Sequence, residues 1–127
     1  MATIKEDYVS FEVAKLLKEK GFDERCTHYY KNEKYLVDLA YANIHSYTNS
    51  DLVEEFAAPT LQMAMKWLRE VHSLHIWIGH AAGKVLSWYY EIHGISDGKV
   101  KHIGGIQCGS YEVACESAIK YCLENLI

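Results

Sequence analysis

Four side chains in the second half of the chain are of types that bind metal ions: His75, Glu91, His93 and His102. Imidazole nitrogens and carboxylate oxygens are ligands for divalent transition metals. If His93 and His102 face each other on paired strands, their Cβ atoms lie about 5 Å apart. Glu91 or His75 could then supply a third ligand. Strand surfaces also accept histidine without any ligand, so we expect no resident metal or cofactor.

Cys108 and His102 are of the residue types that form a catalytic pair of nucleophile and general base. Nothing in their spacing specifies the geometry that such a pair needs. The chain also lacks the G-x-S-x-G, phosphate-loop and HExxH patterns of common enzyme classes. We therefore expect no enzymatic activity.

These side chains come together only if the segment around them forms a sheet. Alternating apolar and polar residues predict antiparallel strands over 74–80, 84–93 and 100–107. Asp97-Gly98 is typical of a two-residue hairpin turn, and Gly83 suits a three-residue turn between the first two strands. The two turns together fix the register of the whole sheet.

That register predicts which side chains share a face. It places His93 opposite His102, and Leu74 opposite Tyr90. An apolar face results, which the helices must cover: Leu74, Ile76, Ile78, Leu86, Trp88, Tyr90, Ile92 and Ile103. The opposite face has no predicted helix over it and collects His75, Trp77, Tyr89, Glu91, His93 and His102.

Helices are predicted over 10–20, 60–72 and 110–125. The segments SFEVA at Ser10 and SYEVA at Ser110 both combine an N-capping serine with a glutamate in the first turn. Gly21 suits the left-handed end of the first helix, and Pro59 suits the entry of the second. The shared letters reflect the same capping chemistry, because little else in the two segments agrees.

The remaining segments complete an α+β prediction. Residues 26–31 and 34–41 read as a hairpin that turns near Asn32-Glu33, and 51–56 as one short helix. We expect one domain over 1–127, built as a two-layer sandwich in which three helices cover one face of a mainly antiparallel sheet. Its C-terminal half has the order α-β-β-β-α.

Composition limits the function further. The chain has 127 residues, half of them apolar, and a net charge of −4. Residues 60–127 hold six basic and six acidic side chains, without the basic surplus that drives phosphate binding. No stretch approaches the roughly 20 apolar residues of a membrane helix. We expect a cytoplasmic protein with free thiols that binds neither membranes nor nucleic acid.

From Pro59 onward, the predicted helix, three strands and helix resemble a double-stranded-RNA-binding domain over about half of the chain. That family opens its last helix with a lysine cluster that grips phosphates, whereas this chain has Ser110, Tyr111, Glu112 and Val113. Its Gly-Pro-x-His loop is replaced here by HAAGKV. The resemblance implies an RNA-binding module as the alternative function.

The segments APTLQMAMKWLREVH (58–72) and SYEVACESAIKYCLENLI (110–127) resemble a group of small uncharacterised proteins of gut-anaerobe genomes and their prophages. The start, YVSFEVAKLLKEKGFDE, is similar to theirs as well. This resemblance implies a mobile-element context and brings no activity with it.

The leading hypothesis is a phage- or mobile-element-derived interaction module that is not an enzyme. Its partner is another protein or a second copy of the chain. The predicted binding residues lie on the open sheet face: Trp77, Tyr89, Glu91, His93 and His102. A small metal-binding protein or metal-dependent enzyme is the further alternative.

Overall fold

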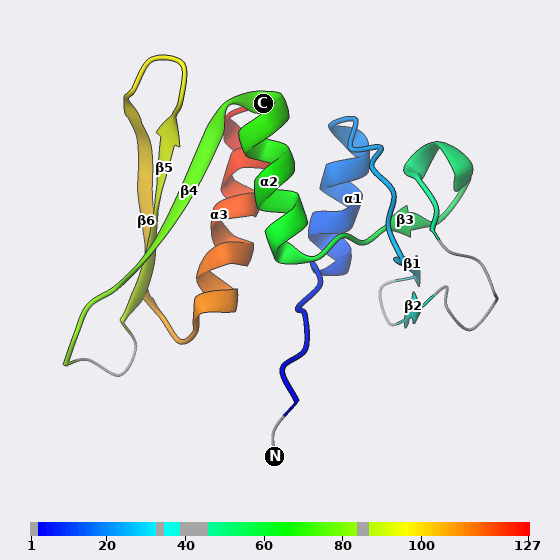
Figure 1. The fold of residues 1–127 in the computed structure, drawn as a ribbon, viewed down its shortest axis with the longest axis horizontal. Coiled ribbons are helices and arrows are strands. Elements are labelled where there is room, and N and C mark those ends of the chain that lie inside the picture. Colours follow the sequence, from blue (N-terminus) through cyan, green and yellow to red (C-terminus); the bar gives the residue numbers. More distant parts are fainter. Residues whose placement is uncertain (1–2, 33–34, 39–45, 84–86) are drawn as a thin grey trace. The chain divides into compact units, whose positions relative to one another are not determined.

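The computed structural model describes residues 3–32, 35–38, 46–83 and 87–127. The chain divides into two compact units, residues 1–61 and 62–127, and each is described by itself. Each unit contains a three-stranded antiparallel sheet with a helix against it (Figure 1). The α+β class is thus confirmed, with two small sheets in place of one larger one. The single-domain organisation stays a prediction.

Helix α1 (Phe11–Glu19) begins and ends where local signals predict. The Ser10 hydroxyl accepts a hydrogen bond from the Val13 amide, which caps the first turn. Gly21 adopts a left-handed φ of 90°, and the Phe22 amide donates to the Leu17 carbonyl. This bond and the left-handed Gly21 belong to a Schellman motif, which satisfies the last carbonyls of the helix and folds Phe22 back into the core.

The first sheet has the order β2-β1-β3, from β1 (His28–Asn32), β2 (Tyr35–Asp38) and β3 (Phe56–Ala57). The antiparallel pairing of β1 with β2 confirms the predicted hairpin. Its predicted turn falls partly on Glu33, which lies outside the described residues.

The short helix predicted over 51–56 is wrong. A 3-10 helix covers Asn49–Asp51, and the chain then extends into β3. Two side chains hold it there. The buried Asn49 accepts a hydrogen bond from the Ala57 amide and donates to the Phe22 carbonyl. The Lys18 ammonium donates to the carbonyls of Leu52 and Glu55, and so takes up the Leu52 carbonyl that a helix would have bonded to the amide of Phe56.

The second sheet has the order β4-β5-β6, and its elements follow the predicted order of helix, three strands and helix. The bounds are α2 (Leu61–His72), β4 (Leu74–His80), β5 (Trp88–Gly94), β6 (Val100–Cys108) and α3 (Tyr111–Asn125). This order agrees with the topology on which the RNA-binding resemblance rests, while the resemblance itself stays a prediction.

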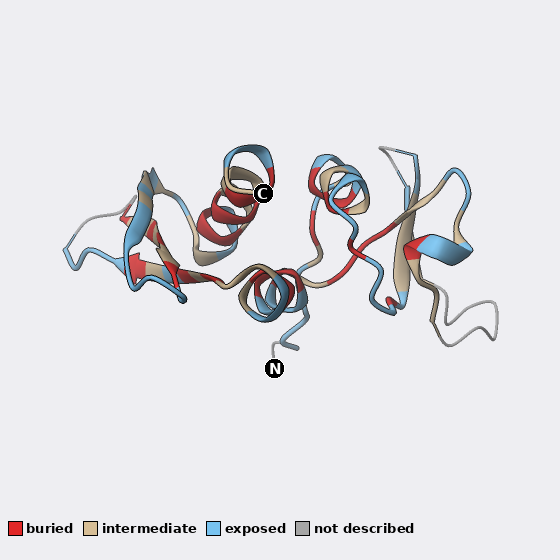
Figure 2. Ribbon diagram, turned by 90° about the horizontal axis from the view of Figure 1, so that it is seen from above, coloured by how far each residue is buried: buried red, intermediate tan, exposed pale blue. Residues whose placement is uncertain are grey.

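Helix α3 covers one face of this sheet and contacts all three strands. Its buried face is made largely of small side chains, which let the helix approach the strands closely: Ala114, Cys115, Ala118, Ile119, Cys122 and Leu123 (Figure 2). From the sheet, Tyr90 and Ile92 are buried. Burial is the main cause that raises the pKa of the Tyr90 phenol.

The register between β4 and β5 differs from the prediction by an even number of residues. Leu74 pairs with Gly94 instead of Tyr90. The difference arises because β5 begins only at Trp88, so the connection is longer than three residues. An even shift keeps every side chain on its predicted face. Leu86, predicted for the apolar face, lies outside the described residues.

From His102 onward the register between β5 and β6 differs by an odd number, and this reverses the faces of that part of β6. Ile92 pairs with His102, and Glu91 with Ile103. The predicted pairing of His93 with His102 is therefore wrong, and Ile103 belongs to the exposed face. The connection runs from Gly94 to Val100 instead of turning tightly at Asp97-Gly98.

Asp97 stabilises this longer connection. Its carboxylate accepts hydrogen bonds from the Lys99 amide and the Lys101 ammonium. The bond from Lys101 is the main cause that holds the Asp97 pKa below its ordinary value. An irregularity in β6 beside Ile92 and His93 then absorbs one extra residue, which produces the odd shift.

Candidate functional site

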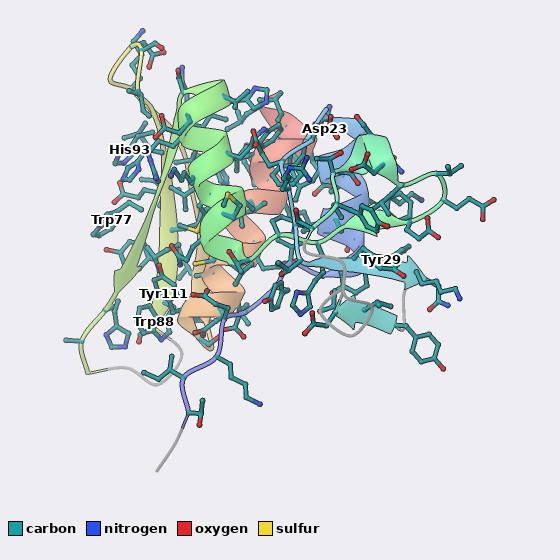
Figure 3. All side chains as sticks on the ribbon, turned by 45° about the vertical axis from the view of Figure 1, so that its right-hand side comes forward. Asp23, Tyr29, Trp77, Trp88, His93 and Tyr111 are labelled. Atoms are coloured by element: carbon teal, nitrogen blue, oxygen red, sulfur yellow. The ribbon has the colours of Figure 1, made fainter. Side chains whose placement is uncertain are left out.

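The face of the second sheet that points away from α3 is the candidate site, and we call it the outer face. Alternation along the paired strands puts these side chains on it: His75, Trp77, Tyr89, Glu91, His93, Val100 and Ile103. Trp77 is 42% exposed, and Val100 and Ile103 are each 54% exposed. Figure 3 shows Trp77 and His93 on the same side of the sheet.

Two aromatic rings form one end of the outer face. Trp77 and Tyr89 meet edge to face, with ring centroids 5.6 Å apart. The Tyr89 ring also lies across Gly79, its partner on β4, so that a side chain at Gly79 would collide with the ring. Gly79 thus lets an aromatic ring lie flat against the strand.

Two imidazoles and a carboxylate form the other end. His75 and His93 are cross-strand partners, and their ring centroids are 6.2 Å apart. Nε2 of His93 is 3.6 Å from Oε1 of Glu91 and makes no hydrogen bond, although that nitrogen atom is buried. Within the described part of the chain, no group of three His, Cys, Asp or Glu side chains could hold a metal ion.

His102, predicted to belong to this face, lies on the opposite one. Its ring stacks on Tyr121 of α3, with centroids 3.6 Å apart and an interplanar angle of 3°. It therefore cannot join His75 or His93 around a ligand. The structure brings together Trp77, Tyr89, Glu91 and His93 and leaves His102 under the helix.

Cys108 and His102 are not brought together as a nucleophile and base either. Cys108 pairs with Trp88, and His102 with Ile92. These partners are four residues apart on β5, which corresponds to about 13 Å along a strand. The other three cysteines are buried, and Cys108 is partly exposed. Burial raises the pKa of the Cys122 thiol to about 12, which keeps it protonated and unreactive.

Sequence reasoning missed a hollow in the first unit. Two tyrosines and three carboxylates line it together with Leu52 and Val53: Tyr29, Tyr47, Asp51, Glu54 and Glu55. Some of this acidic lining already has partners. Asp51 accepts hydrogen bonds from the Thr48 amide and hydroxyl, and Glu55 accepts one from the Glu54 amide. The signal was hard to find because the lining comes from β1 and from the irregular segment before β3.

The chain matches no protein-family model, no curated protein and no solved structure. Of the helices in the described ranges, none is long and apolar enough to cross a membrane.

Proposed function

We propose that this chain is a non-enzymatic interaction module that binds protein through its outer face, and that its partner there is a second copy of the chain. The observation that carries the proposal is the exposure of Trp77, Val100 and Ile103 on a sheet face that no helix of the described residues covers. Exposed aromatic and aliphatic side chains on one face are typical of protein contacts.

The two rows of side chains across the outer face favour a second copy. One row is Trp77, Glu91 and Ile103, and the next is His75, His93 and Val100. The two-fold axis of such a dimer would lie between the two sheets, parallel to the rows and midway between them, and therefore perpendicular to the strands. Rotation about this axis places each row of one copy over the other row of the second copy. Glu91 then meets His93, Trp77 meets His75, and Ile103 meets Val100, so that a carboxylate faces an imidazole, an indole faces an imidazole, and an aliphatic side chain faces another.

The size of the outer face indicates how tightly two copies should bind each other. Three strands of about seven residues cover about 14 by 23 Å, well below the roughly 800 Å² that each partner buries in a standard interface. We therefore expect a weak, reversible dimer with a dissociation constant in the micromolar range.

Analytical ultracentrifugation over a range of protein concentrations tests the proposal. Trp77→Ala removes the largest exposed aromatic side chain of the outer face and should weaken the dimer by about 2 kcal/mol, or about thirtyfold in Kd. Ile103→Ala should weaken it to a smaller extent. Val53→Ala is the matched control, because Val53 is an exposed aliphatic residue of the first unit.

Two results would overturn this proposal. One is a wild-type chain that stays monomeric up to the highest soluble concentration. The other is a dimer that Val53→Ala weakens as much as Ile103→Ala does.

A further inference from the structure

Strand β4 forms one edge of the second sheet and pairs with β5 in one continuous register over all seven of its residues (Figure 1). Two bonds show which backbone groups this pairing uses. The Ile95 amide donates to the Ser73 carbonyl, and the Ala81 amide donates to the Ser87 carbonyl. Hydrogen-bonded residues alternate along an antiparallel strand, so the odd-numbered residues of β4 bond to β5.

The even-numbered residues of β4 point their amides and carbonyls away from the sheet: Leu74, Ile76, Ile78 and His80. None of these outward backbone groups has a hydrogen-bond partner among the described residues. A row of donors and acceptors of this kind is a template for pairing with a further strand.

The two edges of this sheet differ in how they are protected. β6 has two irregularities in its register, left-handed backbone at Gly105 and Gln107, and the charged Lys101. Such features prevent a further strand from pairing. β4 has none of them, since its register is continuous and its sequence contains no Pro, Lys, Arg, Asp or Glu. Of the two edges, β4 is therefore the one suited to pairing.

We propose that β4 pairs antiparallel with β4 of a second copy of the chain, which joins two three-stranded sheets into one sheet of six strands. The outward backbone groups belong to even-numbered residues, so these residues must pair with each other. One such register uses the whole strand. It places Leu74 opposite His80 of the second copy and Ile76 opposite Ile78, with a two-fold axis at Trp77.

The side chains are complementary in this register. The two Trp77 residues form a pair without hydrogen bonds at the axis, where Cα atoms approach to about 4.5 Å and the side chains come closest. His75 lies opposite Gly79 of the second copy, the residue that the Tyr89 ring crosses. No like charges meet, because β4 carries no acidic side chain, lysine or arginine. A second copy thus fits the edge of the first.

This edge contact goes beyond the outer-face contact proposed above and does not rest on it. The edge contact uses backbone groups of β4, whereas the outer-face contact uses side chains from all three strands. Edge pairing also leaves the outer face uncovered, so both contacts can form in one assembly. Ile103 separates them, because it lies on the outer face but on β6, at the opposite edge of the sheet.

Disulfide trapping tests the edge contact. Trp77→Cys in a Cys108→Ala background should form a covalent dimer under mild oxidation, because Cα atoms about 4.5 Å apart suit a disulfide. The outer-face contact alone would not produce it, since stacked sheets lie about 10 Å apart. Ile103→Cys in the same background is the matched control and should stay monomeric on a non-reducing gel.

Amide hydrogen exchange of the wild-type chain gives a readout that needs no variant. The amides of Ile76 and Ile78 should exchange at least about tenfold more slowly at high protein concentration than at low concentration. The amides of Trp77 and Gly79, which bond to β5, should be protected at both concentrations.

Ile103→Ala should leave the exchange at Ile76 and Ile78 unchanged, even where it weakens the outer-face contact. Loss of that contact alone would therefore not affect the edge proposal. Two results would overturn pairing at the edge. One is a Trp77→Cys variant that forms no more covalent dimer than Ile103→Cys. The other is exchange at Ile76 and Ile78 that does not depend on protein concentration.

Discussion

His102 and Tyr121 stack face to face, with ring centroids 3.6 Å apart, and so connect β6 to the last turns of α3. Tyr90 lies at the side of the same imidazole, 5.8 Å from centroid to centroid. This arrangement fixes the orientation of β6, because the residues on either side of His102 along the strand must then point elsewhere. Ile103 consequently points to the outer face.

Replacement of His102 by alanine should destabilise the second unit without affecting the outer face. Loss of one aromatic stack costs about 1 kcal/mol. We expect a lower urea midpoint at unchanged slope, and an unchanged dimer dissociation constant. Val113→Ala, at a half-exposed residue of α3, should leave the urea midpoint close to that of the wild type. A weaker dimer in His102→Ala would show that His102 contributes to the outer face after all.

The helix ends were predictable because their causes are local. Ser10 and Ser110 each accept a bond from the amide three residues later, and Gly21 takes the left-handed conformation that glycine favours. Each signal lies within a few residues of the structure that it determines, so the sequence alone sufficed.

The faces of the sheet were predictable only in part. Those of β4 and β5 survived a wrong turn length because the shift in register was even. Those of β6 did not, because Asp97 bonds to Lys99 and Lys101 and stabilises a longer connection than Asp97-Gly98 suggests. Hydrogen bonds of this kind depend on side-chain positions that periodicity does not encode.

The division into two sheets could not be read from the sequence either. Strand patterns indicate which segments extend, but not which of them pair. In the first unit, β3 pairs with β1 although 23 residues (33–55) separate them in the sequence. Asn49 bonds to the Ala57 amide and Lys18 to the Glu55 carbonyl, which holds β3 in this place. Such long-range bonds determine the structure of the segment 51–56, although its own sequence predicts a short helix.

A charge in the interface between α3 and the sheet should unfold the second unit. Ala118 is fully buried, and an unpaired carboxylate there costs several kcal/mol. Ala118→Asp should therefore abolish the cooperative thermal transition seen by circular dichroism. Val113→Asp provides the comparison, since Val113 is on the same helix but 51% exposed. If both variants melt like the wild type, α3 does not pack on the sheet as described.

The buried thiols should make stability fall at high pH. Burial raises the pKa of Cys115 to about 11 and that of Cys122 to about 12, from an ordinary value of 9.0. The folded state thus holds these protons after the unfolded state has lost them, so the free energy of unfolding decreases as the pH rises from 9.0 toward about 12.

Cysteine-to-alanine replacement isolates this thiol contribution, because alanine cannot ionise. Urea titrations at several alkaline pH values should show a smaller decrease in the Cys115→Ala, Cys122→Ala double variant than in the wild type. At neutral pH, a thiol reagent should modify Cys108 first, because Cys108 is the partly exposed cysteine, and should reach the buried thiols only after unfolding. Rapid modification of Cys115 or Cys122 in the folded protein would contradict their burial beneath the sheet.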